Sequence, residues 1–144
     1  MSNISPIDGR YKKNVSELET FFSEQALMRH RVMVEVEYLL ALVEHKSFQK
    51  TRTLSKKAFN SLKGLYVKFS STHFKEIKKI EKKTKHDVNA VVVFVSEKLK
   101  KIGRDDLVPF VHFGLTSEDI NNISYSLMTR GAVDNVMILS LIHI

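Results

Sequence analysis

The stretch Val88-Asn89-Ala90-Val91-Val92-Val93-Phe94-Val95 decides whether this chain contains a β-strand or is helical throughout. Valine and phenylalanine favour strands, so composition alone predicts a strand here. The apolar residues nevertheless recur at helical intervals through a charged tail, over a run of 15 residues: Val88, Val91, Val92, Val95, Leu99 and Ile102. This periodicity predicts a helix and, with it, an all-α fold.

Two helices are expected near the start of the chain. A short helix from about Ser16 would carry an apolar face of Leu18, Phe21 and Phe22. A longer helix follows, because the next apolar residues share the spacing of a single stripe. That stripe consists of Met28, Val32, Val36, Leu39, Leu40 and Val43.

Two more helices are expected before the valine-rich stretch. Lys46 to Ser55 is polar and is predicted to form a loop. The next apolar stripe comprises Leu54, Ala58, Leu62, Leu65, Tyr66 and Phe69. Ser70-Ser71-Thr72 then interrupts the pattern, and Thr72 is expected to cap a lysine-rich helix. The apolar residues of that helix are Phe74, Ile77 and Ile80.

Downstream, Gly103 is expected to end the valine-rich helix, and Pro109 to restart the chain. The segment Phe110-Val111-His112-Phe113-Gly114-Leu115-Thr116-Ser117-Glu118-Asp119-Ile120-Asn121-Asn122 follows. Within it, Thr116 and Asp119 have the spacing of a helix N-cap and its reciprocal acidic residue. A further helix is therefore predicted after Thr116, with an apolar stripe of Ile120, Ile123 and Leu127 that continues towards Val133 and Val136.

The same segment is rich in groups that bind anions. It contains the His112 imidazole, the adjacent hydroxyls of Thr116 and Ser117, and Gly114, which allows a ligand to approach the backbone closely. Hydroxyls at a helix start lie where free N–H groups and the helix dipole favour a carboxylate or phosphate. Two interpretations stay open on this spacing: a ligand site, or a well-capped helix.

Two other segments carry polar groups suited to binding. Arg10 follows the turn-forming residues Pro6, Asp8 and Gly9, and its planar guanidinium suits phosphate or carboxylate. His86 and Asp87 lie at the start of the valine-rich helix, where an imidazole suits proton transfer or pairing with phosphate. A surface arginine and a surface histidine are the alternative interpretations.

Composition indicates one globular domain, because 144 residues with 43% hydrophobic content can bury one sizeable core. The absence of cysteine excludes a disulfide framework, a thiolate metal site and a thiol nucleophile. The first residues lack the layout of a signal peptide, and the longest apolar run, Ala90 to Val95, is too short to cross a bilayer. A cytoplasmic protein without a membrane segment is therefore expected.

The net charge of +7 is concentrated before His86, in Lys75, Lys78, Lys79, Lys82, Lys83 and Lys85. Such a cluster is typical either of a nucleic-acid footprint or of a solvated helix face. The segment has one aromatic residue, Phe74, and no arginine, and Glu76 and Glu81 are interspersed at helical spacing. A solvated face is favoured, and nucleic acid is not the expected partner.

Three motifs in this order resemble the N-terminal region of the bacterial adenylosuccinate lyase family, within the aspartase/fumarase superfamily. They are Ser-Pro-Ile-Asp-Gly-Arg-Tyr at 5–11, Thr-Lys-His-Asp-Val at 84–88 and His-Phe-Gly-Leu-Thr-Ser-Glu-Asp-Ile-Asn-Asn at 112–122. The resemblance runs from about Asn3 to Val136. It implies an N-terminal helical lyase domain over residues 1–115, followed over 116–144 by the beginning of the first long helix of a central helical bundle.

What the resemblance implies in chemical terms is β-elimination in purine biosynthesis. Such lyases cleave adenylosuccinate to AMP and fumarate, and also release fumarate from the succinylated aminoimidazole carboxamide ribotide. A base removes a proton beside a carboxylate, and an acid protonates the departing nitrogen. No metal or organic cofactor is implied. The implied partners are the purine nucleotide substrate and the other subunits of a homotetramer.

The resemblance also assigns substrate-binding roles. It implies that Arg10 and Tyr11 contact the nucleotide phosphate. It implies that Thr116 and Ser117 hold the succinyl or fumarate carboxylate, which agrees with the anion-site interpretation. His112 lies in the same motif and is given a supporting role.

The second substrate-binding segment implied by the family contains Lys85, His86 and Asp87. His86 is expected near the phosphate, in a positioning role. Lys85 departs from the family pattern, which has Asn or Arg there, so a backbone contact is retained more readily than a side-chain amide contact.

The family's general-acid His and general-base Ser belong to Thr-His-Gly-Gln-like and Ser-Ser-x-Met-Pro-x-Lys-like segments that lie beyond residue 144. Of the last nine residues, Val136 to Ile144, seven are apolar, and those from about Ser140 differ from the polar sequence expected of the family. We therefore expect a truncated N-terminal portion that is inactive alone. The alternative function is a basic helical module that binds nucleic acid or another anion through Lys75 to Lys85.

Overall fold

The computed structural model describes residues 5–49 and 53–142, without the side chains of residues 48 and 49. No β-strand occurs in these ranges, which confirms the all-α prediction. The elements in order are η1 (Lys12–Leu18), α1 (Glu19–Phe22), α2 (Glu24–Glu44), α3 (Lys46–Gln49), α4 (Lys56–Val67), α5 (Ser71–Thr84), α6 (Asp87–Lys101), η2 (Asp105–Phe110), α7 (Ser117–Ala132), η3 (Val133–Met137) and α8 (Ile138–Ile142).

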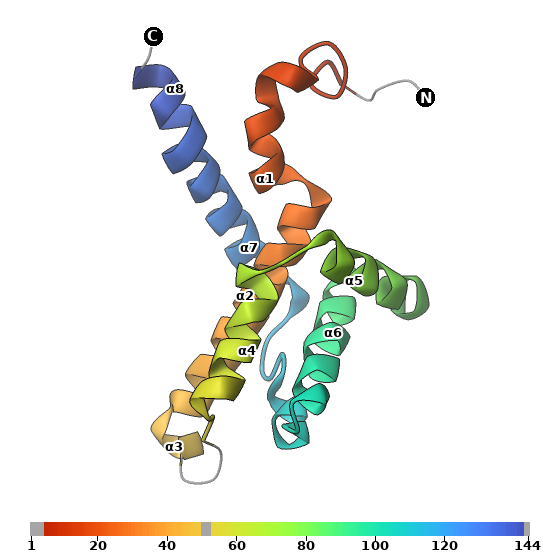
Figure 1. Cartoon of the computed structure of the whole chain (residues 1–144), viewed down its shortest axis with the longest axis vertical. Coiled ribbons are helices and arrows are strands. Elements are labelled where there is room, and N and C mark those ends of the chain that lie inside the picture. Colours follow the sequence, from red (N-terminus) through yellow and green to blue (C-terminus); the bar gives the residue numbers. More distant parts are fainter. Residues whose placement is uncertain (1–4, 50–52, 143–144) are drawn as a thin grey trace.

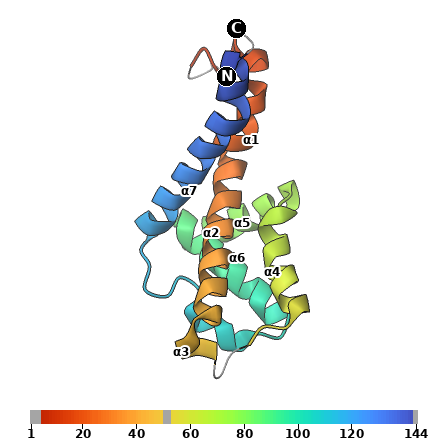
Figure 2. The same cartoon turned by 90° about the vertical axis from the view of Figure 1, so that its left-hand side faces the viewer.

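The long helix α2 is the element on which the others pack. It contacts α1, α3, α4, α5, α6 and α7. Figure 2 shows α4 on one side of α2 and α7 on the other. Burying a large apolar side chain contributes about 1.5–3 kcal/mol, so the core around α2 is the main source of stability. The largest fully buried apolar residues of that core are Met28, Leu39, Leu62, Ile77, Phe94, Leu99 and Leu107.

The valine-rich stretch forms the helix α6, as its periodicity predicts. Val88, Val91, Val95 and Leu99 are all buried, so the helical stripe faces the core. The helix ends where predicted, since Ile102 is its C-cap and Gly103 follows with a left-handed φ of +71°. Burial of one continuous stripe outweighs the strand propensity of the individual valines.

The N-terminal helix expected from Ser16 is divided into two elements. Residues Lys12–Leu18 form the 3₁₀ helix η1, which is interrupted at Val15, and Glu19–Phe22 form α1. Ser23 then caps α2, because its Oγ accepts a hydrogen bond of 3.1 Å from the Ala26 N–H. The apolar stripe predicted for the longer helix is buried over its whole length: Met28, Val32, Val36, Leu39, Leu40 and Val43.

Three local predictions are wrong. Lys46–Gln49 forms the short helix α3 instead of a loop; residues 50–52 of the expected loop lie outside the described residues. The N-cap residue of α5 is Ser70 and not Thr72. The Ser70 N–H donates to Nδ1 of His73 over 3.3 Å, so a histidine occupies the capping-box position at which Glu or Gln is usual. Pro109 lies inside the short helix η2 and does not restart the chain.

The last helices form one continuous rod. α7 is followed by the π-helical turn η3 and by α8, and in Figure 1 this rod and the η1–α1 segment rise from the same end of α2 as two arms. The arms meet at Gly131, where an added Cβ would lie 2.8 Å from Cε1 of Phe21. Among the described residues, no helix is both long enough and apolar enough to pass through a membrane.

Candidate functional site

Two of the three predicted site segments meet on α2, through a residue that was not predicted. Arg31 is only 2% exposed. Its Nη2 lies 2.7 Å from Oδ2 of Asp87 at the start of α6. Its Nε donates to Oδ1 of Asn121, the fifth residue of α7, over 3.0 Å. The guanidinium therefore fixes the 84–88 segment relative to the 112–122 segment.

Asp87 is ionised more readily than an isolated aspartate. Burial opposes ionisation of its carboxyl, but the Val88 N–H, which donates to Oδ1 over 2.8 Å, and the Arg31 guanidinium outweigh that effect and lower its pKa. The carboxylate also lies in the first turn of α6, where the helix dipole favours negative charge. Arg31 and the Val88 N–H therefore fix the position of the Asp87 carboxylate, although 44% of its side chain is exposed.

His86 is the N-cap residue of α6. Its Nδ1 accepts a hydrogen bond of 3.2 Å from the Asn89 N–H, and its side chain is 51% exposed. Because Nδ1 accepts, the neutral ring carries its proton on Nε2. The exposed part of the ring can therefore present an N–H donor to a ligand.

Lys85 ends α5 in the left-handed conformation, with φ +55° and its N–H bonded to the Glu81 carbonyl over 2.8 Å. This conformation disfavours residues with a Cβ, and Asn tolerates it better than Lys does. Lys85 therefore adopts a backbone conformation that is more favourable for Asn or Gly than for Lys.

The N-cap predicted at Thr116 is confirmed. Oδ2 of Asp119 accepts from the Thr116 N–H over 2.7 Å, and the Asp119 N–H donates back to Thr116 Oγ1 over 3.4 Å. The backbone and side-chain hydrogen bonds from Thr116 lower the Asp119 pKa. In the described residues the N–H groups of Ser117 and Glu118 have no hydrogen-bond partner. The capped-helix interpretation holds, and ligand binding at Ser117 stays a prediction.

His112 precedes this helix and has a partner that the sequence did not reveal. Its Nδ1 lies 2.5 Å from Oε1 of Glu35, a residue of α2 that is fully buried. Burial raises the pKa of the Glu35 carboxyl, against the opposing effect of the imidazole. Arg31 and Glu35 are four residues apart on α2, so one helix face holds both segments.

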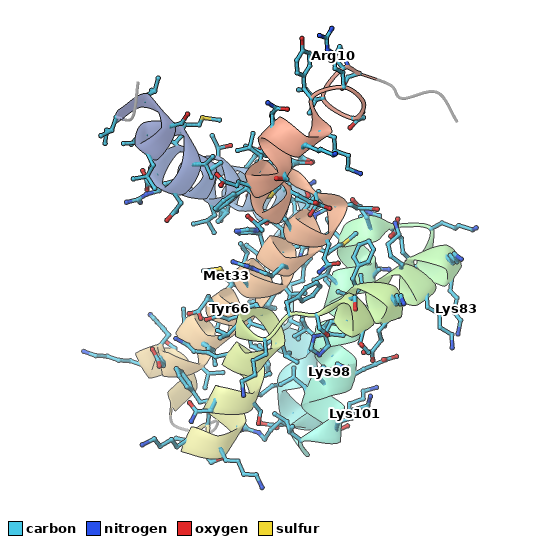
Figure 3. The ribbon with its side chains drawn as sticks, turned by 45° about the horizontal axis from the view of Figure 1, so that its top comes forward. Arg10, Met33, Tyr66, Lys83, Lys98 and Lys101 are labelled. Atoms are coloured by element: carbon cyan, nitrogen blue, oxygen red, sulfur yellow. The ribbon has the colours of Figure 1, made fainter. Side chains whose placement is uncertain are left out.

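The structure does not bring the first motif to the other two. Arg10 and Tyr11 are exposed, and the Arg10 guanidinium lies 5.6 Å from the centre of the Tyr11 ring. Figure 3 shows Arg10 at the end of the molecule, beyond η1. Among the described residues, no hydrogen bond or ion pair joins either residue to the 84–88 or 112–122 segment.

Comparison with known proteins gives a match to the family model described as lyase, over residues 9–144. The chain belongs to this lyase family. It is similar to the adenylosuccinate lyases of Escherichia coli (strain K12), at 40% identity over 139 residues, and of Dictyostelium discoideum, at 39% over 141. It is 38% identical over 138 residues to that of Legionella pneumophila (strain Corby).

These matches cover 95–96% of the chain but only 30% of each relative. The chain therefore spans somewhat less than a third of the length of the curated lyases that it matches. The resemblance identified from the three motifs is confirmed over nearly the whole of the chain.

The lysine-rich face of this lyase-family chain is partly neutralised by its own carboxylates. Lys78 lies 2.6 Å from Glu24 and 2.7 Å from Glu81, and Lys98 of α6 lies 2.7 Å from Glu76. Figure 3 shows Lys83 extending outward from α5. The remaining lysines of this segment are exposed, which agrees with the interpretation of a solvated helix face: Lys75, Lys79, Lys82, Lys83 and Lys85.

The sequence contains one signal for Arg31 and Glu35: each is a charged residue next to a residue of the apolar stripe of α2. They directly precede Val32 and Val36, which are fully buried stripe residues. Their partners, however, lie 90 and 77 positions further along the chain. Helical periodicity therefore indicates that both side chains are buried but not what they contact.

Replacing Arg31 with methionine should separate the two site segments. We expect the free energy of unfolding to fall by about 1.5–3 kcal/mol, because the buried hydrogen bonds to a charged group are lost. Urea denaturation measures the change. Amide hydrogen exchange should also accelerate at the starts of α6 and α7. Arg29→Met, at an exposed position of the same helix, is the control and should stay within about 0.5 kcal/mol; equal losses in both variants would contradict the proposed contact.

Replacing Lys85 with glycine should stabilise the chain by about 0.5–1 kcal/mol, because glycine relieves the left-handed backbone strain. The matched control is Lys83→Gly, inside α5. There glycine should destabilise by a similar amount, roughly 0.5–1 kcal/mol, through its poor helix propensity. Thermal and urea unfolding give both values, and a loss of stability at both positions would refute the strain argument.

Proposed function

We propose that this chain is the N-terminal part of an adenylosuccinate lyase of purine nucleotide biosynthesis. The reaction is the β-elimination of fumarate from adenylosuccinate, which gives AMP, and from the succinylated aminoimidazole carboxamide ribotide. The observation that carries the proposal is the lyase-family match over residues 9–144, together with about 40% identity to adenylosuccinate lyases. The enzyme is proposed to be a cytoplasmic homotetramer.

The proposed role of this part of the enzyme is to bind substrate. Ser117 and Thr116 hold the succinyl or fumarate carboxylate at the start of α7. This assignment is supported by the two backbone N–H groups in the first turn of α7 that have no partner among the described residues, those of Ser117 and Glu118. Ser117 is half-buried, so a bound carboxylate there would be partly shielded from water.

The nucleotide phosphate is the proposed ligand of the other two motifs. His86 presents an N–H donor from the N-cap of α6, next to Lys85 and Asp87. Arg10 and Tyr11 are exposed at the far end of the chain (Figure 3). Their separation supports a site completed by neighbouring subunits, in which Arg10 and Tyr11 of one copy face the His86 segment of another.

Proton transfer is proposed to depend on residues outside positions 1–144. Of the histidines in the proposed site, His86 is used in capping α6 and His112 is bonded to Glu35.

The domain assignment is also a proposal: residues 1–115 form a helical domain and residues 116–144 begin a central bundle. The exposed apolar residues along the end of the rod support it, because they need a covering partner: Met137, Ile138, Leu139, Leu141 and Ile142.

The proposal is tested in a chimaera in which this chain replaces the matched 30% of the Escherichia coli relative. The chimaera should release fumarate from adenylosuccinate, which is followed spectrophotometrically. The isolated 144-residue chain should release none, because the acid and the base are absent. A folded, tetrameric chimaera without activity, or turnover by the isolated chain, would overturn the proposal.

In the same chimaera, Ser117→Ala should lower kcat/KM by about 10²-fold, as the loss of one donor at a developing or bound anion typically does. Ser126→Ala is the matched control on α7, since Ser126 is exposed and its hydroxyl donates to the Asn122 carbonyl over 2.8 Å. Its activity should be retained. Circular dichroism checks that both variants fold, and equal kinetics would show that Ser117 does not hold the substrate.

A further inference from the structure

Glu35 is a buried carboxylate that the proposed substrate contacts do not use. It is 0% exposed and lies on α2, among residues that form the core. Oε1 lies 2.5 Å from Nδ1 of His112, and Oε2 is buried without a hydrogen-bond partner among the described residues. Within the described chain, His112 therefore supplies the hydrogen bonds to this carboxylate, from its imidazole and from its backbone.

A carboxylate in this position is costly for the fold. Removing a charge from water carries a penalty of several kcal/mol, and the hydrogen bonds from His112 alone do not fully offset it. An apolar side chain of similar volume is commonly as stable or more stable at such a position. Stability alone therefore does not account for Glu35.

The loop around His112 is held in an unusual conformation on the same helix. His112 has a φ of +62°, which costs a residue with a Cβ about 1–2 kcal/mol. The next residue is also fixed, because the Tyr38 hydroxyl donates to the Phe113 carbonyl over 2.8 Å. Two α2 residues, Glu35 and Tyr38, thus hold the loop in this conformation.

The other side of the ring faces away from the core. The His112 side chain is 22% exposed, and in the described part of the chain its Nε2 has no hydrogen-bond partner. The pKa of Asp119 is lowered chiefly by its hydrogen bonds to Thr116, with a smaller electrostatic effect of His112, so the ring lies in the neighbourhood of the start of α7. Nε2 is therefore the ring nitrogen that is available for a hydrogen bond to a ligand.

We propose that Glu35 is a positioning residue for His112, which it holds with the proton on Nδ1 and with Nε2 presented to an anionic oxygen bound at the start of α7. In the neutral ring Nε2 carries a lone pair. When Nε2 takes up a proton, the Glu35 carboxylate stabilises the imidazolium and Nε2–H donates to the anion. The ligand is a carboxylate or a phosphate, and only this last point rests on the proposed function.

The tautomer of His112 tests the proposal directly in the 144-residue chain. Nitrogen-15 chemical shifts of labelled histidines, recorded at a pH where the rings are neutral, report which nitrogen carries the proton. His112 should be in the Nδ1–H form. His86 is an internal control with the opposite form, because its Nδ1 accepts from the Asn89 N–H. A neutral His112 in the Nε2–H form overturns the proposal.

A pair of variants tests the part played by Glu35. Glu35→Leu keeps the volume and removes the acceptor, so the ratio of Nδ1–H to Nε2–H tautomer should fall about tenfold or more, as expected for the loss of a charged hydrogen bond. Glu37→Leu, on the same helix, removes a carboxylate that pairs with Lys63 and Tyr66 instead and should leave the His112 tautomer unchanged.

An unchanged tautomer in a folded Glu35→Leu chain overturns the role of Glu35. If that variant does not fold, the wild-type spectrum still decides, since an Nε2–H form of His112 there is sufficient to reject the proposal. The measurement needs no substrate and no turnover. Its failure is therefore distinguishable from a failure of the lyase assignment, which the fumarate assay reports.

Discussion

The burial of α2 is the constraint on which the rest of the molecule depends. Its apolar stripe lies in the centre of the core, and α4, α5, α6 and α7 all pack on it. The same helix carries two buried charges of opposite sign one turn apart, Arg31 and Glu35. Apolar burial supplies the stability, whereas each charge has a desolvation cost that is offset only by its specific partner. The charges therefore determine where the loops lie rather than whether the chain folds.

The difference between buried and exposed ion pairs decides which of them matter. Exposed pairs such as Arg130 with Asp134 contribute about 0–1 kcal/mol and are screened by salt. Arg31, by contrast, is held between Asp87 and Asn121 in a buried environment, where an unpaired partner would cost more than 1 kcal/mol. The single buried arginine therefore has a larger influence on the positions of the site segments than any exposed ion pair.

Local physics explains which features the sequence predicted. The α6 helix follows from a stripe within 15 residues, and the N-cap of α7 from a contact between Thr116 and Asp119. The capping histidine of α5, His73, was missed because cap patterns normally contain Glu or Gln. The partners of Arg31 and Glu35 were missed for a different reason: 90 and 77 residues separate them from Asn121 and His112, and no local rule relates such positions.

The start of α7 shows how capping and ligand binding limit each other. The Asp119 carboxylate accepts a hydrogen bond from the Thr116 N–H. Its negative charge also reduces the positive electrostatic potential at the start of α7 that would attract a ligand carboxylate. A second carboxylate beside Asp119 is repelled unless a positive group lies within a few ångströms. In the proposal above, His112 supplies that charge when a ligand binds, because its Nδ1 is bonded to the buried Glu35 and its Nε2 has no partner among the described residues. The buried Glu35 thus makes an anion site compatible with an acidic N-cap box, at the cost of one desolvated carboxylate and one left-handed histidine.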